Sequence, residues 1–159
     1  MKGTRSFFAI IAIALGMAAP AWAGLNDPEV IIYRFPGLKD DGGADNVGVA
    51  TVFNCTNFSG AFENIRFVGR NEVGGLLNNT LVQFFAHLAS LAVTSHVVAA
   101  YSGFVPKLNT QAVSSGTVAI AATSTNIICT AMIIDAANPK PVGVALRGIR
   151  FSPVPGSEE

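Results

Sequence analysis

Short runs of apolar residues alternate with polar ones along this chain, and glycine, asparagine, proline and serine separate the runs. Segments with a helical period are scarce, whereas β-branched and aromatic residues are common within the runs. Pro36 and Gly37 are predicted to end the first strand, before a polar loop at residues 38–46. The first three predicted strands are residues 30–35 (VIIYRF), 47–55 (VGVATVFNC) and 63–70 (ENIRFVGR).

The most apolar run is residues 124–135 (STNIICTAMIID), which we predict to form the central strand. The face that does not carry the cysteine would carry Ile128, Met132 and Ile134. A sheet in a two-layer sandwich has one face toward water, yet both faces of this strand are apolar. We therefore expect the second face to be covered, either by another segment of the chain, for example residues 80–91 folded as a helix, or by another molecule.

The segment 80–101 fits two interpretations. The apolar residues of its first half follow a helical spacing, and Thr80 with Gln83 resembles a helix capping box. β-Branched residues dominate the second half and favour a strand. We predict two strands, about 81–88 and 93–101, and the alternative is a short helix within 80–91.

Two further strands are predicted at residues 117–122 and 142–151, the latter with Val142, Val144 and Leu146 inward. About eight short strands without strand–helix–strand alternation are typical of an all-β fold, here an antiparallel β-sandwich of immunoglobulin-like architecture. A membrane β-barrel is the competing all-β interpretation. It is disfavoured because two tyrosines are too few to form the aromatic girdles that such barrels carry.

Residues 1–23 have the features of a secretory signal peptide. A positively charged start precedes an apolar run of 11 residues (FFAIIAIALGM), which is shorter than the about 20 residues that span a bilayer. The sequence AWA before Gly24 fits the small-x-small rule of signal peptidase. Cleavage there would leave one domain over residues 24–151 and a flexible tail at 152–159, with no membrane insertion.

The chain without its first 23 residues is poor in charge. It has eight basic and ten acidic residues, so that 18 of 136 residues are charged, against a usual share of about 25%. A net charge of −2 excludes an electrostatic footprint for nucleic acid or for anionic membranes. Low charge is typical either of extensive contact with copies of itself or another protein, or of a surface built from serine, threonine, asparagine and glycine.

Cys55 and Cys129 are the only cysteines. Export to an oxidising compartment and an even count predict an intramolecular disulfide between strands, which could join the two sheets as in immunoglobulin domains. The tryptophan that packs beside the disulfide in those domains is missing, because Trp22 belongs to the signal peptide. Free thiols and an intermolecular bridge are the alternatives.

Two groups of residues have metal-binding side chains. His87 and His96 would lie opposite each other in a hairpin, but two imidazoles make an incomplete site. A Gly-rich loop offers oxygen ligands of the kind that calcium prefers, from Asp40, Asp41, Asp45 and Asn46. Ordinary surface side chains are the commoner outcome for both groups, so no metal and no cofactor is predicted.

Two surface features could bind ligands. If residues 63–70 and 142–151 were neighbouring strands, a basic strip for an acidic glycan would form from Arg66, Arg70, Arg147 and Arg150. Ordinary solvated strand faces are the commoner outcome for such arginines. A concave carbohydrate-binding face would expose aromatic side chains from Phe58, Phe62, Tyr101 or Phe104.

The common catalytic signatures are absent: there is no G-x-S-x-G, H-E-x-x-H, P-loop, G-x-G-x-x-G or C-x-x-C motif. The leading hypothesis is a secreted, non-catalytic β-sandwich that acts as a structural or interaction module in the periplasm, at the cell surface or outside the cell. Its partner would be itself or another cell-envelope protein. A carbohydrate- or small-ligand-binding domain is the alternative, and an enzyme of another type is the third.

Overall fold

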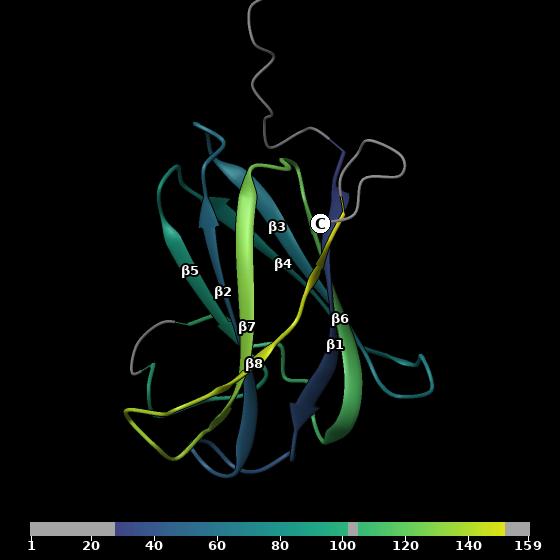
Figure 1. Ribbon diagram of the computed structural model, residues 1–159, viewed down its shortest axis with the longest axis vertical. Coiled ribbons are helices and arrows are strands. Elements are labelled where there is room, and N and C mark those ends of the chain that lie inside the picture. The colour runs from purple at the N-terminus through teal and green to yellow at the C-terminus, as the bar shows by residue number, and fades with distance from the viewer. Residues whose placement is uncertain (1–27, 102–104, 152–159) are drawn as a thin grey trace, which may run out of the picture.

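The chain folds into two antiparallel β-sheets that pack together as a sandwich (Figure 1). The computed structural model describes residues 28–101 and 105–151, with Gln83 and Phe84 described by their backbone alone. The described residues form nine strands and no helix, which confirms the all-β sandwich and excludes the predicted alternative of a helix within 80–91.

One sheet has five strands, in the order β4 (Leu76–Phe85), β3 (Glu63–Arg70), β6 (Val113–Ala122), β1 (Val30–Asp40) and β9 (Ile149–Arg150). The other has four strands, in the order β5 (Ser90–Thr94), β2 (Val49–Asn57), β7 (Ile127–Asp135) and β8 (Val144–Leu146). The predicted central strand is β7, which pairs with β2 along its whole length.

Four aromatic rings form the centre of the core. Tyr33 stacks on Phe35 at 5.6 Å between ring centroids, and Phe53 lies 5.7 Å from both Phe35 and Phe67. Phe53 belongs to the four-stranded sheet, whereas the other three rings belong to the five-stranded sheet. The Phe53 ring therefore packs between rings of the opposite sheet, and such aromatic contacts stabilise beyond their buried area.

Strand β1 does not end at Pro36 and Gly37 as predicted, but continues to Asp40. Gly37 has a φ of +86°, and the pairing with β6 shifts register between Pro36 and Leu38, so the strand absorbs both residues in an irregularity. Proline is tolerated because β9 pairs only with Tyr33 and Arg34, which leaves β1 without a second neighbouring strand at Pro36.

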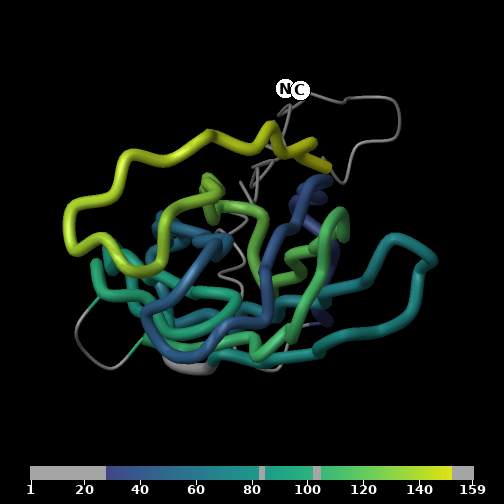
Figure 2. Tube along the Cα trace, turned by 90° about the horizontal axis from the view of Figure 1, so that it is seen from below, coloured from purple at the N-terminus to yellow at the C-terminus, as the bar shows by residue number. Residues whose placement is uncertain are grey.

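The predicted strand 142–151 is two short strands, and the predicted inward orientation of Val142 and Val144 is wrong, since they are 92% and 70% exposed. The chain leaves β8 in one sheet and joins β9 in the other, so it crosses one side of the sandwich (yellow in Figure 2). Gly148 lies at the crossing against the ring of Phe35, where a Cβ would overlap the ring.

Strands β4 and β5 lie in different sheets, so the predicted hairpin between them does not form. After Thr94 the chain leaves the sheet, and the predicted strand to Tyr101 ends there. Val98 packs instead in a second apolar cluster on the outer face of the four-stranded sheet, together with Ala50, Val52, Ile134 and Ala136. The chain's own residues therefore cover one half of the outer face of β7.

Residues 105–110 run along the opposite side of the sandwich. Thr94 donates to the Pro106 carbonyl and accepts from the Leu108 amide, which joins this segment to the edge of β5. The side chain of Leu108 is fully buried in the core, and its carbonyl accepts from Asn78 on β4. Both open sides of the sandwich are thus partly closed, one by β8 and β9 and the other by this segment.

Among the described residues, no helix is long and apolar enough to cross a membrane. The predicted signal peptide, the predicted tail and Phe104 lie outside the described residues.

Candidate functional site

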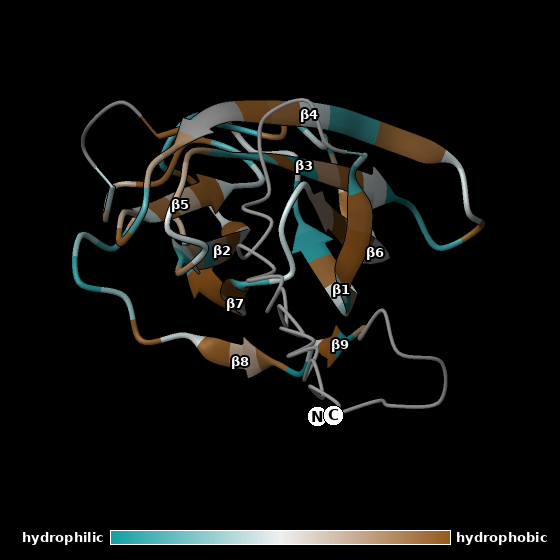
Figure 3. Cartoon of the chain, turned by 90° about the horizontal axis from the view of Figure 1, so that it is seen from above, coloured by the Kyte–Doolittle hydropathy of each residue, from teal (hydrophilic) through white to brown (hydrophobic). Residues whose placement is uncertain are grey.

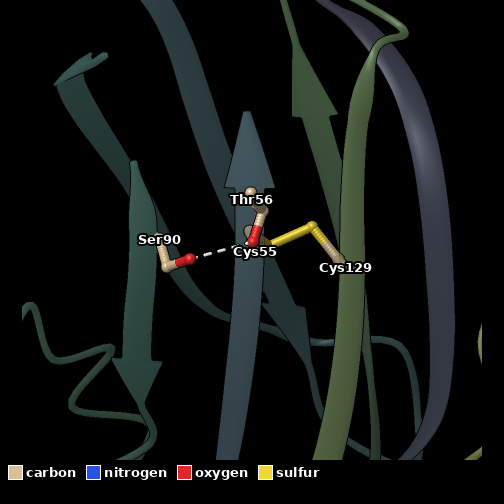
Figure 4. Close-up of a disulfide and its surroundings, with 4 residues drawn as sticks. All are labelled: Cys55, Thr56, Ser90 and Cys129. Carbon is tan, nitrogen blue, oxygen red and sulfur yellow. Dashed lines mark hydrogen bonds between the residues drawn. A yellow bond between two sulfur atoms is a disulfide. The ribbon is translucent and has the colours of Figure 1, made fainter. Parts of the chain in front are cut away.

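The disulfide joins Cys55 and Cys129 as predicted (Figure 4). The two residues are direct partners on β2 and β7, with 4.1 Å between their Cα atoms. Both strands belong to the four-stranded sheet, so the expectation that the bond would join the two sheets is wrong. Directly opposite residues approach to about 4.5 Å in the closer type of cross-strand pair, which brings the sulfur atoms together. The bond is a buried cross-strand link within the core.

Asp40 and His96 meet at the end of β1, although 56 positions separate them in the chain. Asp40 Oδ2 lies 2.9 Å from His96 Nδ1, and the Asp40 side chain is fully buried. The same carboxylate accepts from the Thr110 hydroxyl at 3.1 Å and from the Gly42 amide at 2.7 Å. His96 Nε2 lies 3.1 Å from the Val47 carbonyl. Asp40 therefore holds together the loop after β1, the segment after β5 and the segment before β6.

Asp41 holds the same loop from within. Its carboxylate accepts from the Gly43 amide at 3.2 Å and from the Val49 amide at 2.8 Å. Gly48 has a φ of +74° and lies against this carboxylate, where a Cβ would overlap it. The loop between β1 and β2 thus needs both the carboxylate and the glycine.

Asp40, Asp41 and His96 each present one ligand atom within 4.8 Å of the others, a donor set of two oxygens and one nitrogen. Zinc and other borderline metals accept such a set. The group contains two of the four residues of the acidic loop that the sequence offers as calcium ligands, and Asp45 and Asn46 lie outside it. All three side chains already form hydrogen bonds within the protein. The arrangement is therefore explained by its role in linking neighbouring loops.

Replacing Asp40 by alanine is expected to lower the free energy of unfolding by about 1–3 kcal/mol, because the buried Thr110 hydroxyl loses its acceptor. Urea denaturation followed by circular dichroism measures this. Asp45→Ala is the matched control, since Asp45 is exposed in the same loop, and it should change stability by less than about 0.5 kcal/mol. If EDTA lowered the stability of the wild-type protein as much as Asp40→Ala does, the cluster would be a metal site instead.

The hairpin that would place His87 opposite His96 does not form. His87 follows β4 in the five-stranded sheet and accepts from the Gly60 amide at 3.0 Å, whereas His96 follows β5 in the four-stranded sheet. In the structure His96 bonds to Asp40 of the acidic loop. The sequence pattern gives these two metal-binding groups as separate candidates.

The condition for a basic strip is not met either, because β6 and β1 separate β3 from β9. Arg66 binds Glu29 at 2.6 Å, and this hydrogen bond raises the pKa of Arg66 above its usual value. Arg70 donates to the Gly74 carbonyl, and Arg150 donates to the Thr125 carbonyl. The arginines thus serve the fold at separate places.

Glu63 is a buried acid that sequence patterns do not single out. It is fully buried at the start of β3, where one carboxylate oxygen accepts from the Thr123 hydroxyl. The other oxygen, Oε1, has no hydrogen-bond partner among the described residues. The alternation within residues 63–70 places Glu63 on the same side as Ile65 and Phe67, which is the one sequence feature that indicates its burial. A charged residue at the end of a strand is normally exposed, so this feature alone does not identify a buried acid.

A hollow of about 360 Å³ is lined in part by the segment that follows His96, residues 97–99. Half of its lining residues are aliphatic, namely Val97, Val98, Ala99 and Val105, and polar groups come from Asn46, Thr94 and Lys107. Tyr101, one of the predicted ligand-binding aromatics, also lines it, and the Tyr101 hydroxyl donates to Asn54 at 3.3 Å. The hollow has the dimensions of a site for a small ligand.

The outer face of the four-stranded sheet carries no Asp, Glu, Lys or Arg. Direct strand partners share a face, so the pairing assigns this face residue by residue. From β5 and β8 it receives Ser90, Ala92, Thr94 and Ala145; from β2 and β7 it receives Ala50, Val52, Asn54, Thr56, Ile128, Thr130, Met132 and Ile134.

Large apolar side chains are exposed at the end of this face that residues 95–101 do not cover. Ile128 is 48% exposed on β7. Phe58 follows β2, and its amide donates to the Asn126 carbonyl just before β7. The Leu88 amide donates to the Asn57 carbonyl, which places Leu88 at the same end. We call Phe58, Leu88 and Ile128 the apolar end.

The fold and the disulfide define a two-sheet antiparallel β-sandwich with one cross-strand bond. No protein-family model and no curated protein matches the chain. The solved structure described as "Crystal Structure of Thermotoga maritima 1070" is similar over 79% of this chain and 94% of its own, with 13% sequence identity and a TM-score of 0.45. Similarity at this level says nothing of function.

Proposed function

We propose that this chain is a secreted, non-catalytic β-sandwich that acts as an interaction module in the periplasm or at the cell surface. The observation that carries the proposal is the uncharged outer face of the four-stranded sheet with its apolar end. The disulfide supports an oxidising compartment, since such bonds persist mainly outside the cytoplasm.

An uncharged face suits contact with another protein. Burying it removes apolar area from water without desolvating a charge, and the cores of protein interfaces are depleted in charged residues. Hydroxyl groups that can hydrogen-bond to a partner protein come from Thr56, Ser90 and Thr130. The Thr56 and Ser90 hydroxyls already bond to each other at 3.0 Å (Figure 4). The apolar end adds three exposed apolar side chains to this face, and exposed apolar patches are typical of interaction sites.

The test combines export with site-specific cross-linking in the producing cells. Protein recovered outside the cytoplasm should begin at Gly24, and a photo-cross-linker at Ile128 should give a discrete adduct. A cross-linker at Glu72, which is exposed on the turn between β3 and β4, is the matched control and should give none. Cytoplasmic protein with an intact N-terminus, or equal adducts at both positions, would refute the proposal.

A second candidate function is binding of a small ligand or carbohydrate in the hollow beside Tyr101. The support is the apolar wall with a single cation, Lys107, which suits a ligand with an apolar body and one acidic group. Titration with a panel of acidic sugars and short fatty acids, monitored by NMR, tests it. Shifts confined to the hollow that disappear in Lys107→Ala would support this function, and an unchanged spectrum would remove it.

A further inference from the structure

Strand β4 forms one edge of the five-stranded sheet, and it is unlike the other edges. Figure 3 shows it at the outside of the molecule, with no labelled strand beyond it. It is 10 residues long, against two for β9, three for β8 and five for β5. The edge of β5 is partly paired, because Thr94 bonds to residues 106 and 108. Among the described residues, β4 is therefore the long open edge of the sandwich.

The sequence of β4, LLNNTLVQFF, contains no charged residue and no proline. Natural sheets normally protect an exposed edge with charges, proline, bulges or a short strand length, because unpaired amides and carbonyls are a template for another strand. β4 lacks the first two devices, and at 10 residues it is not short. Its pairing with β3 shifts register near both ends of the strand, between Glu63 and Ile65 and between Gly69 and Arg70. From Ile65↔Val82 to Gly69↔Asn78 the pairing is regular, so only the middle of the edge, residues 78–82, is free of bulges.

We propose that the partner of this edge is the β4 edge of a second copy of the chain, paired antiparallel about a two-fold axis near residues 80–81. Such a contact is isologous, so each donor on one strand meets an acceptor on its copy, and the two five-stranded sheets become one continuous sheet.

Charge permits pairing with a second copy and disfavours a strongly charged partner. No register of β4 against itself brings like charges into contact, since the strand has none. The arginine opposite Leu81, Arg66, is already paired with Glu29 and donates to Asn79, so the surface beside the edge is locally neutral. A strongly charged partner would find no complementary group on the strand. This inference goes beyond the proposed function, because it concerns a different surface from the outer face around Ile128.

The decisive variant is Leu81→Glu. Residue 81 lies directly opposite Arg66 on the outer face, so a glutamate there suits the monomer, while two copies would bring like charges together near the axis. Ala119→Glu is the matched control, since residue 119 lies opposite Arg34 on the same face but on β6, two strands in from the edge.

Analytical ultracentrifugation of the purified proteins over a range of concentrations provides the measurement. The wild-type protein and Ala119→Glu should form a dimer, and Leu81→Glu should weaken it by roughly tenfold or more. Hydrogen exchange of the β4 amides should slow as the wild-type concentration rises. If circular dichroism shows that Leu81→Glu does not fold, Asn79→Asp, which keeps an acceptor for Arg66, replaces it.

Three results would overturn the inference: a wild-type monomer at every concentration, a dimer that Leu81→Glu leaves intact, or a dimer that Ile128→Lys dissociates instead. The last result would support the proposed interaction face while refuting the β4 contact. A monomeric protein that still cross-links to another partner through Ile128 would likewise separate the two proposals.

Discussion

Replacing Cys55 and Cys129 together by alanine is expected to lower the free energy of unfolding by about 4 kcal/mol. The bond joins residues that are 74 positions apart, so its loss gives the unfolded chain a large gain in conformational entropy. Both side chains are buried in the core, and their removal also leaves unfilled space between β2 and β7. Urea denaturation of the wild type and the double variant measures the difference.

A reducing agent provides the control for the disulfide prediction. It should lower the stability of the wild-type protein toward that of the double variant and leave the double variant unchanged. A wild-type protein whose denaturation midpoint is the same with and without reductant would show that the bond contributes nothing to stability.

Replacing Phe53 by alanine is expected to cost about 3–5 kcal/mol. The Phe53 side chain is fully buried and packs between the rings of Phe35 and Phe67, so its truncation opens a cavity where the two sheets meet. The loss should appear as a lower urea midpoint and as weaker near-ultraviolet circular dichroism from the aromatic cluster.

Phe62→Ala is the matched control for Phe53, because the same side chain is removed where it is 54% exposed. We expect a change within about 0.5 kcal/mol there. Equal losses at both positions would contradict the description of Phe53 as the ring that joins the sheets.

Most of the strands follow from local pattern. The alternation in residues 63–70 matches β3 residue for residue, because side chains on a strand alternate between core and solvent regardless of which strand lies alongside. The pattern fails at both ends of the chain's described part. At Pro36 it did not show that β1 lacks a second neighbour, and at Val142 and Val144 an alternating apolar run crosses the side of the sandwich in the open.

The candidate site was only half visible in the sequence. The acidic loop and His96 are each recognisable in the sequence. Their contact depends on the end of β1 lying beside the segment that follows β5. Sequence spacing instead suggested His87 as the partner of His96, on the assumption that successive strands form a hairpin. The assumption fails because β4 and β5 belong to different sheets, and the partner of His96 is Asp40.

The sequence by itself determined the all-β class, most of the strands, the poverty of charge and the single disulfide. These properties depend on the two-residue period, on composition and on the presence of only two cysteines, all of which are local or countable. The tertiary structure decided which sheet each strand joined. It thereby placed the disulfide within one sheet, covered half of the outer face of β7 with residues 95–101, and left β4 as an open edge. The physical reason is that strand pairing is a long-range contact, selected by burial of all the faces at once, and no short stretch of sequence contains that information.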